Sequence, residues 1–126
     1  MYLDITKSIE PILSPILDYC QQHGYGILLG MDSNAHHTDW GVETNERGCQ
    51  MEHIIDNYGL TIHNRGRVPT YECKLGKSII DLTLSNRFPL KIDNWTVNRN
   101  YNGSDHNTIL YQHYHAIPAI FTKDMF

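Results

Sequence analysis

The sequence predicts a mixed α/β fold, because two kinds of hydrophobic periodicity occur along it. Residues 8–22 and 46–58 space their apolar side chains three and four positions apart, as an amphipathic helix does. Shorter stretches are rich in β-branched and aromatic residues and are separated by Gly, Asn or Pro turns. We expect strands at 26–31, 60–63, 70–73, 78–85, 95–99 and 108–114. With 126 residues, 40% of them hydrophobic, the chain can bury one core and no more than one domain.

The first predicted helix, 8–22, has one apolar stripe formed by Ile9, Ile12, Leu13, Ile16, Leu17 and Cys20. Ser8 could cap it, Pro11 would fall in the tolerant first turn, and Gly24 would end it. Pro15 would lie inside the helix, where proline removes a hydrogen bond and costs about 3 kcal/mol. We therefore expect a kink, or a restart capped by Ser14.

The run at 26–31 is apolar throughout and predicts a buried strand that delivers Asp32 and Asn34 into the loop after it. The second helix, 46–58, is expected to use Asn45 as its cap and Gly59 as its terminator. Its apolar face comprises Met51, Ile54, Ile55 and Tyr58.

The remaining strands are expected to include a hairpin over 70–84 whose turn carries Lys74, Gly76 and Lys77. Trp40 and Trp95 are interpreted as packing aromatics, and the two lysines as a solvated turn. Residues 115–126 are interpreted as a tail.

The overall charge disfavours a general polyanion-binding surface, since the formal net charge is -4 and the pI is about 6.0. Metal-dependent nucleases are a partial exception, because a bound cation neutralises their clustered acidic residues. Three cysteines without a C-x-x-C pair disfavour a disulfide framework or a zinc site and favour a reducing compartment. No apolar run approaches membrane-spanning length, so no membrane partner is expected.

Chemistry-bearing residues recur at the ends of the predicted strands. Asp32 and Asn34 follow the first strand, Asp81 lies within a β-branched strand, and Asp105 and His106 precede the last one. Carboxylates, a carboxamide and an imidazole in these places suggest a phosphate-cleaving site. A carboxylate such as Asp81 is costly in a strand unless it has a partner, and a histidine elsewhere could be that partner.

Simpler interpretations exist for three of these residues, and other histidines suggest a different site. Asp32 and Asn34 could close a turn by side-chain hydrogen bonds to the backbone. Asp81 could lie on the solvent face of an edge strand. His36 and His37 could form a zinc site with Asp39, but adjacent imidazoles point apart and thiol partners are absent.

The order Asp32-x-Asn34-x-His36, Ile80-Asp81-Leu82 and Ser104-Asp105-His106 resembles the endonuclease/exonuclease/phosphatase family, which includes DNase I and the abasic-site endonucleases. Neighbouring stretches resemble the endonuclease domain of non-LTR retrotransposon polyproteins. They are Trp40-Gly41, Asn45-Glu46-Arg47-Gly48, Pro69-Thr70-Tyr71, Asp81-Leu82-Thr83-Leu84 and Trp95-Thr96-Val97. The resemblance implies a partial domain at 1–114, the C-terminal half of a four-layered α/β sandwich of the DNase I-like type.

The resemblance also implies roles in phosphodiester hydrolysis. Asp32 would orient or deprotonate the attacking water, Asn34 would hold a phosphate oxygen or the metal, and His106 would donate to the scissile phosphate. Asp81 would fix the tautomer of that histidine. Mg²⁺ or Mn²⁺ would be held by Asp105 with Asp32 and Asn34, and Tyr2 would correspond to an active-site tyrosine.

The family carries an asparagine and a metal-binding glutamate in an upstream half, which has no counterpart in this sequence. We therefore expect a fragment of a Mg²⁺-dependent, DNA-nicking endonuclease of a non-LTR retrotransposon, acting on chromosomal DNA in the nucleus. Its expected partners are DNA, the missing N-terminal half or a reverse transcriptase domain, and a second copy by self-association. The alternatives are an abasic-site repair nuclease or another phosphodiesterase of the family, and an inactive remnant that only binds nucleic acid or protein.

Overall fold

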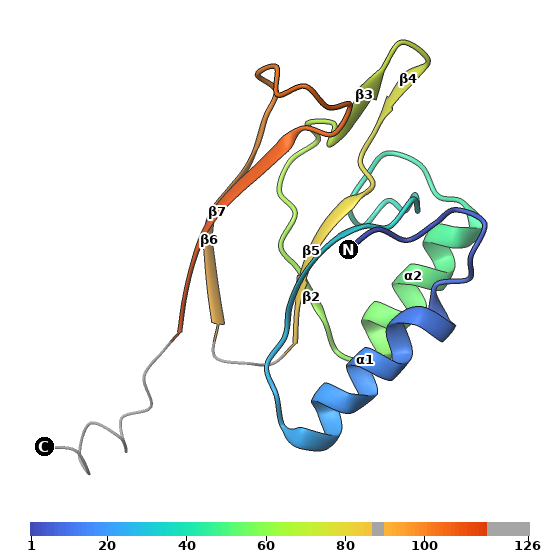
Figure 1. The fold of residues 1–126 in the computed structure, drawn as a ribbon, viewed down its shortest axis with the longest axis vertical. Coiled ribbons are helices and arrows are strands. Elements are labelled where there is room, and N and C mark those ends of the chain that lie inside the picture. Colours follow the sequence, from blue (N-terminus) through green and yellow to red (C-terminus); the bar gives the residue numbers. More distant parts are fainter. Residues whose placement is uncertain (87–89, 116–126) are drawn as a thin grey trace, which may run out of the picture.

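The computed structural model describes residues 1–86 and 90–115. The fold has three layers. Two helices cover one face of a three-stranded sheet, and a long two-stranded hairpin lies on the other side (Figure 1). The helices are α1, Glu10–His23, and α2, Glu46–Asn57. The sheet has the order β1-β5-β2, with bounds Leu28–Asp32, Asp81–Ser85 and Thr61–Ile62. The hairpin pairs β6, Leu90–Asn98, with β7, Thr108–His115.

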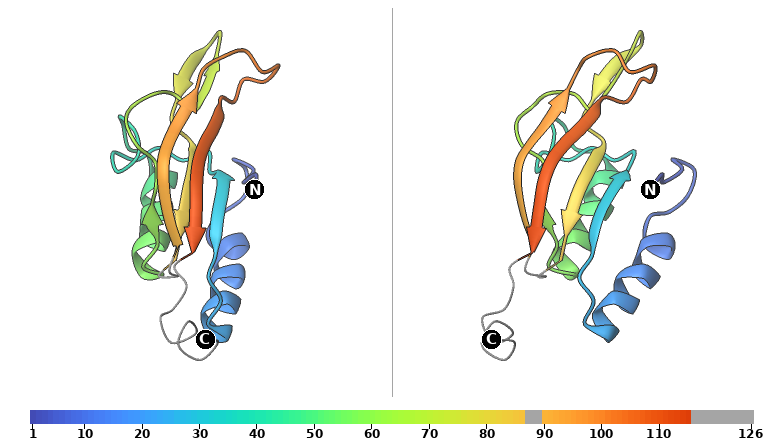
Figure 2. Two further views of the ribbon diagram at one scale, coloured as in Figure 1. Left: turned by 90° about the vertical axis from the view of Figure 1, so that its left-hand side faces the viewer. Right: turned by 60° about the vertical axis from the view of Figure 1, so that its left-hand side comes forward.

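A second, short hairpin pairs β3, Tyr71–Cys73, with β4, Gly76–Ser78. This β3–β4 hairpin and the loop between β6 and β7 extend beyond the three-stranded sheet at the same end of the molecule (Figures 1 and 2). β1 ends and β5 begins at this end of the sheet. Chain segments distant in the sequence therefore meet there.

Alternation along β1 and β5 separates the two faces of the central sheet. Leu29 and Met31 of β1, with Leu82 and Leu84 of β5, belong to the hydrophobic core shared with the helices. Because successive side chains of a strand point to opposite faces, Asp32, Asp81 and Thr83 lie on the face away from the helices. The indole of Trp95 in β6 donates to the Thr83 hydroxyl at 3.0 Å, which joins the β6–β7 hairpin to that face.

The ends of the helices follow the predicted pattern in part. Asn45 caps α2 by accepting a hydrogen bond from Gly48 N, and Gly24 ends α1 in the left-handed conformation, as predicted. The expected Ser8 cap is wrong, since Ile9 occupies that position without a side-chain hydrogen bond. A restart at Ser14 is also wrong, because α1 continues through Pro15. Burial of the stripe that includes Leu13 and Leu17 offsets the cost of that proline.

The predicted strand 78–85 is divided at residues 79 and 80, where the chain passes from the short hairpin to the central sheet. Side chains replace the ladder hydrogen bonds there. The Thr70 hydroxyl accepts from Ile80 N and Asp81 N, and Ser33 donates from both N and Oγ to Ile80 O. The turn of the β3–β4 hairpin is only residues 74 and 75, because Gly76 and Lys77 belong to β4.

The strand predicted at 95–99 is longer than expected, since β6 begins at Leu90. An irregularity between Asp93 and Thr96, with Asn94 at a positive φ of 56°, interrupts its pattern and hid its first half. Trp40 and Trp95 are buried packing residues, as predicted. The proposed tail lies outside the described residues apart from its first position. Within residues 1–86 and 90–115, no helix combines the length and apolar character needed to cross a membrane.

We expect the chain to self-associate through the uncovered edge of β1. A groove of about 460 Å³ runs beside it and is lined by Tyr2, Gly30, Ile109 and Tyr111 among others. On the edge of β1 that β5 does not occupy, residues 1–3 are the only described residues that pair with it, at its Asp32 end. Exposed strand edges pair with other chains, and charge on them opposes this. Sedimentation velocity should show concentration-dependent association.

A substitution at Gly30 tests the surface involved. A Cβ there meets no atom within 4 Å, so Gly30→Lys should add a charge without a backbone clash and reduce association. Gly76→Lys, which also meets nothing, should leave association unchanged. A monomeric wild-type chain at micromolar concentration would refute the expectation.

Candidate active site

Three ionisable side chains converge on the open face of the central sheet. They come from the last residue of β1, the first residue of β5 and the loop before β7, namely Asp32, Asp81 and His106. His106 Nδ1 lies 2.9 Å from Asp81 Oδ2 and 3.1 Å from Oδ1, and His106 Nε2 lies 3.4 Å from Asp32 Oδ2. One ligand atom of each of the three residues lies within 4.8 Å of the others. The predicted hydrogen bond between Asp81 and His106 is therefore present.

The antiparallel register of the sheet and the short hairpin bring these residues together. Asp32 is the cross-strand partner of Asp81, which places the two carboxylates on one face. The His106 loop is held against β3 by a bridge between His106 and Tyr71 and by a hydrogen bond from Glu72 N to Asp105 O of 2.8 Å. Strands far apart in the sequence thus fix the position of the imidazole.

Asp81 determines which nitrogen of His106 faces the groove. Its carboxylate only accepts hydrogen bonds when ionised, so Nδ1 donates and Nε2 is directed toward Asp32. The alternative of a solvent-facing edge strand does not apply, because β5 is the central strand and the Asp81 side chain is only 15% exposed.

The pKa of Asp32 is raised above its usual value. Burial is the main cause, and the neighbouring carboxylate of Asp81 adds to it. A hydrogen bond from Asn34 N and the positive fields of His106 and Arg47 oppose the shift. A half-buried carboxylate beside a second one is a site that a cation would stabilise.

Asn34 lies near these three residues but faces a different hollow. Its backbone N–H donates to Asp32 Oδ1 at 3.2 Å, so the turn considered from the sequence does exist. Its side-chain amide donates to Leu3 O at 2.8 Å, and its φ of 50° is left-handed. It lines a hollow of about 430 Å³ beside Lys7 and Arg47.

Asp105 and Tyr2 lie beside the cluster rather than within it. The Asp105 side chain is not among the three that converge, and the residue is exposed. Its carboxylate lies close enough to Tyr71 to raise the pKa of that phenol, after the larger effect of a hydrogen bond with Cys73. Tyr2 is 66% exposed, pairs with Asp32 through its backbone and lines the groove.

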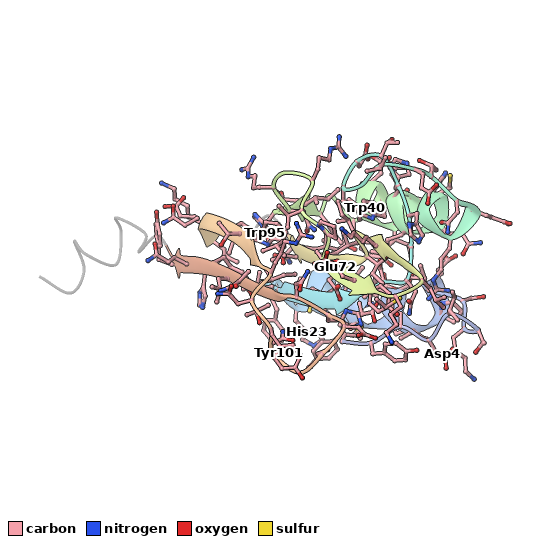
Figure 3. All side chains as sticks on the ribbon, turned by 90° about the horizontal axis from the view of Figure 1, so that it is seen from above. Asp4, His23, Trp40, Glu72, Trp95 and Tyr101 are labelled. Carbon is pink, nitrogen blue, oxygen red and sulfur yellow. The ribbon has the colours of Figure 1, made fainter. Side chains whose placement is uncertain are left out.

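Several residues around the cluster were not predicted as site residues. The ring of Tyr71 packs edge-on against His106 with centroids 5.1 Å apart. Asn107 donates to Glu72, which also binds Arg99, and these contacts join the His106 loop to the β3–β4 hairpin (Glu72 is labelled in Figure 3). The only sequence signal for Tyr71 is the family-like stretch Pro69-Thr70-Tyr71.

The network around Glu72 is strongly polar. Hydrogen bonds from Arg99 and then Asn107 lower the pKa of Glu72 to about 2, so it stays ionised over the whole neutral range. Its side chain thus bridges Arg99, which follows β6, and Asn107, which follows His106.

His37 accepts a hydrogen bond from Asp39 N at 3.0 Å through Nδ1 and lies beside the ring of Trp40, at 5.2 Å between centroids. Both contacts are local to this loop. In the described part of the chain, the only group of three potential metal ligands is the cluster at Asp32.

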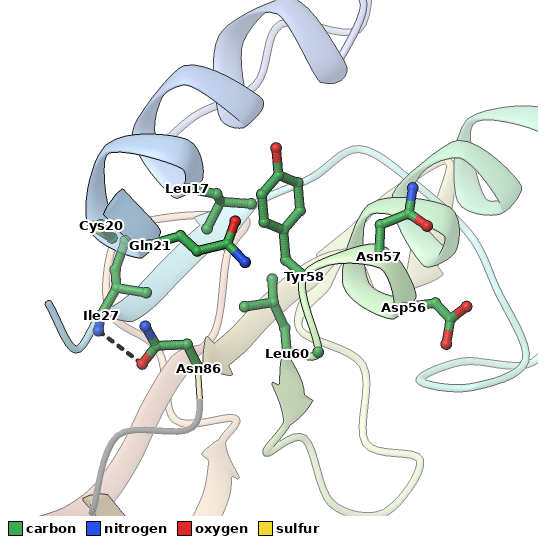
Figure 4. Close-up of a pocket in the computed structure, with 10 residues that line it drawn as sticks. Leu17, Cys20, Gln21, Ile27, Asp56, Asn57, Tyr58, Leu60 and Asn86 are labelled. Atoms are coloured by element: carbon green, nitrogen blue, oxygen red, sulfur yellow. Dashed lines mark hydrogen bonds between the residues drawn. The ribbon is translucent and has the colours of Figure 1, made fainter. Parts of the chain in front are cut away.

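Elsewhere in the described residues, no three potential metal ligands lie within 4.8 Å of one another. A hollow of about 400 Å³ between α1 and the end of α2 is shown in Figure 4, where Asn86 accepts from Ile27 N. Its lining includes Leu17, Tyr58 and Leu60, and its carboxylate is Asp56. The chemistry of the molecule is therefore concentrated at the end of β1.

The donor atoms of the cluster fit a divalent cation in part. Mg²⁺ prefers oxygen ligands and is commonly held by one or two carboxylates together with water and phosphate. Asp32 offers such a carboxylate at the groove, whereas Asp81 already accepts from His106. An ion here would therefore depend on Asp32 and on oxygens from outside the cluster.

Replacing Asp32 by asparagine should stabilise the chain when no metal is present. Like charges directly opposite each other across strands destabilise a sheet by about 0.2 to 1 kcal/mol. Because the folded-state pKa of Asp32 is raised, its ionisation destabilises the fold as the pH rises through that pKa. In EDTA, the Tm of Asp32→Asn should exceed that of the wild type at pH 8. The two Tm values should be equal at a pH below the ordinary pKa range of carboxylates. Glu43→Gln in an exposed loop is the charge-matched control, and an unchanged or lower Tm for Asp32→Asn at pH 8 would contradict the expectation.

Comparisons with known proteins identify the family and the fold of this chain. The family model described as endonuclease-reverse transcriptase matches residues 1–110. Among solved structures, the endonuclease domain of TRAS1, a telomere-specific non-LTR retrotransposon, matches with a TM-score of 0.75 and 31% sequence identity. The match covers 87% of this chain and 53% of that chain, so this chain spans about half the length of that domain. No curated protein matches the sequence significantly.

The DNase I-like α/β class expected from the sequence is thus confirmed by a solved domain of the same kind. The matched range includes the whole cluster of Asp32, Asp81 and His106. The chain belongs to the endonuclease-reverse transcriptase family.

Proposed function

We propose that this chain carries one half of the active site of a Mg²⁺-dependent endonuclease that nicks DNA for a non-LTR retrotransposon. The observation that carries the proposal is the cluster in which Asp81 holds His106 by a 2.9 Å hydrogen bond beside Asp32. Its position in an open groove leaves room for an extended phosphodiester. The retroelement branch is favoured over abasic-site repair and other phosphodiesterases by the likeness to the TRAS1 domain.

His106 and Asp81 act as a unit in this proposal. Asp81 accepts from Nδ1, which fixes the ring and leaves Nε2 to face the scissile phosphate. A proton held at Nε2 would be donated to a phosphate oxygen, whose charge increases in the transition state. Asp32, 3.4 Å from Nε2, would orient or deprotonate the attacking water.

The other predicted residues would act at the border of the cluster. Asp105 and Asp32, with Asn34, would hold Mg²⁺ or Mn²⁺, and Tyr2 would line the substrate groove. The metal, when bound, supplies a positive charge that neutralises the phosphate. Asn34 would offer its side-chain oxygen to the metal, since its amide nitrogen donates to Leu3 O.

The proposed function also implies partners for this chain. DNA is the proposed substrate, acted on in the nucleus, and the remaining half of the DNase I-like fold would complete the site. In a full polyprotein, a reverse transcriptase domain would use the nick as its primer. The partial coverage of the TRAS1 domain supports this division, because the chain matches about half of it.

A plasmid-nicking assay tests the proposal. The isolated chain should convert supercoiled plasmid to open circles slowly in Mg²⁺ and not in EDTA. We expect feeble activity, because losing even one electrostatic contributor lowers kcat by about 10² to 10³. No Mg²⁺-dependent nicking at all would favour the inactive-remnant alternative, and robust nicking would show that the other half of the fold is not needed.

A further inference from the structure

Arg47 in the first turn of α2 donates hydrogen bonds to four backbone carbonyls. Nε donates to Ser33 O at 2.9 Å and Nη1 to Lys7 O at 2.7 Å, while Nη2 donates to Asp4 O at 3.1 Å and Leu3 O at 3.3 Å. The residue is half-buried. One guanidinium thus joins the loop after β1 to the segment of residues 3–7.

Those carbonyls belong to the two segments that carry predicted site residues. Ser33 lies between Asp32 and Asn34, and Leu3 follows Tyr2 directly. Leu3 O also accepts from the side-chain amide of Asn34 at 2.8 Å, and Leu3 N donates to Asp32 O at 2.9 Å. Arg47 is therefore linked by hydrogen bonds through Leu3 to both Asp32 and Asn34, the neighbours of Ser33.

The N-terminal end of α2 is itself held against the loop that follows β1. The guanidinium of Arg47 therefore has a defined position. Asn45 N donates to His36 O at 3.0 Å, and Asn45 Oδ1 accepts from His36 N and Gly48 N. A Cβ on Gly48 would lie 1.6 Å from His36 O, so only glycine permits this approach. The stretch Asn45-Glu46-Arg47-Gly48 is thus a docking element for residues 33–36.

A direct role in binding phosphate does not suit Arg47. Its Nε, Nη1 and Nη2 atoms all donate to carbonyls within the protein. A planar guanidinium presents its donors in a fixed fork, which matches several acceptors at once, whereas an ammonium group offers a single point charge. The geometry suits a support for the loop rather than a contact to DNA.

We propose that Arg47 is a positioning residue of the endonuclease site, which holds the loop of Asp32 and Asn34 and the segment of Tyr2 in one arrangement. The proposal rests on the proposed function of the site for its catalytic consequence. It predicts that the contacts of residues 1–7 with residues 32–34 loosen when the guanidinium is removed. A misplacement of about 1 Å in such a loop can cost about 10²-fold in rate.

Amide hydrogen exchange measured by mass spectrometry tests the positioning without relying on activity. In Arg47→Met, the amides of residues 2–7 and 32–34 should exchange at least about tenfold faster than in the wild type, with α1 unchanged. Arg47→Lys keeps the charge but not the fork, and should give an intermediate increase. Arg65→Met, which removes an exposed arginine of the same charge, should leave both segments unchanged.

Nicking kinetics provide the second measurement. Arg47→Met should lower kcat by about 10² with little change in the KM for plasmid, and Arg47→Lys should recover part of the loss. The proposal would be overturned if residues 2–7 and 32–34 exchanged at the wild-type rate in Arg47→Lys or in a folded Arg47→Met. A wild-type chain that does not nick DNA would instead count against the proposed function, while the exchange data would still decide the role of Arg47.

Discussion

Gly48→Ala is expected to destabilise the chain severely, although alanine is the better helix former. Helix propensity alone predicts a gain of about 1 kcal/mol from this substitution. The new Cβ would lie 1.6 Å from the carbonyl oxygen and 2.4 Å from the carbonyl carbon of His36, so α2 or the loop must move. Overpacking of this kind costs about 1 to 3 kcal/mol or more, and the contacts of Asn45 to the loop would be strained as well. We expect a net loss of about 3 kcal/mol, which lowers the Tm by about 10 to 20 °C.

Gly76→Ala is the matched control for this prediction. A Cβ at Gly76, in the β3–β4 hairpin, meets no atom within 4 Å. Its effect on the free energy of unfolding should stay within about 0.5 kcal/mol. Thermal unfolding followed by circular dichroism measures both variants. A Gly48→Ala chain as stable as the wild type would show that α2 does not approach residues 33–36 as closely as described.

His106→Ala should remove nearly all Mg²⁺-dependent nicking. General acid-base catalysis contributes about 10² to 10⁴-fold, so the initial rate should fall by that factor, to the background of the assay. Asp81→Asn should also lower the rate, because an amide in place of the carboxylate no longer accepts from Nδ1 with a full charge. Initial rates of open-circle formation measure the effect.

His53→Ala provides the control for a general effect of losing a histidine. His53 is exposed on α2, which covers the opposite face of the central sheet from the cluster (Figures 1 and 2). Its variant should nick at the wild-type rate. Equal rates for His106→Ala and the wild type would exclude His106 from the chemistry.

Much of the fold was predictable from local patterns. The apolar spacing of α2 and the cap at Asn45 are local features, and so is the stop of α1 at Gly24. The division of the strand at Ile80 could not be predicted, since Ile80 N donates to Thr70, 10 positions away, and Ile80 O accepts from Ser33, 47 positions away. The first half of β6 was missed for a local reason, the irregularity at Asn94.

The site was predictable where a residue type is chemically unusual for its position in the sequence. An aspartate in an apolar strand signals a need for a partner, and Asp81 has one in His106. Asn34, however, faces another hollow, which no spacing along the loop could indicate. Arg47 and Tyr71 were not identified because their contacts join segments distant in the sequence, and neither residue type is distinctive there.

The most direct test of the central claim compares nicking of supercoiled plasmid by the wild-type chain, Asp32→Ala, His106→Ala and the double variant, at equal concentration in Mg²⁺. If the two residues act as one unit, each single substitution should abolish the Mg²⁺-dependent rate, and the double variant should lose no more. Circular dichroism spectra matching the wild type would show that the variants are folded. Mg²⁺-dependent nicking that persists at the wild-type rate in Asp32→Ala and His106→Ala would contradict the assignment of this cluster as the endonuclease site.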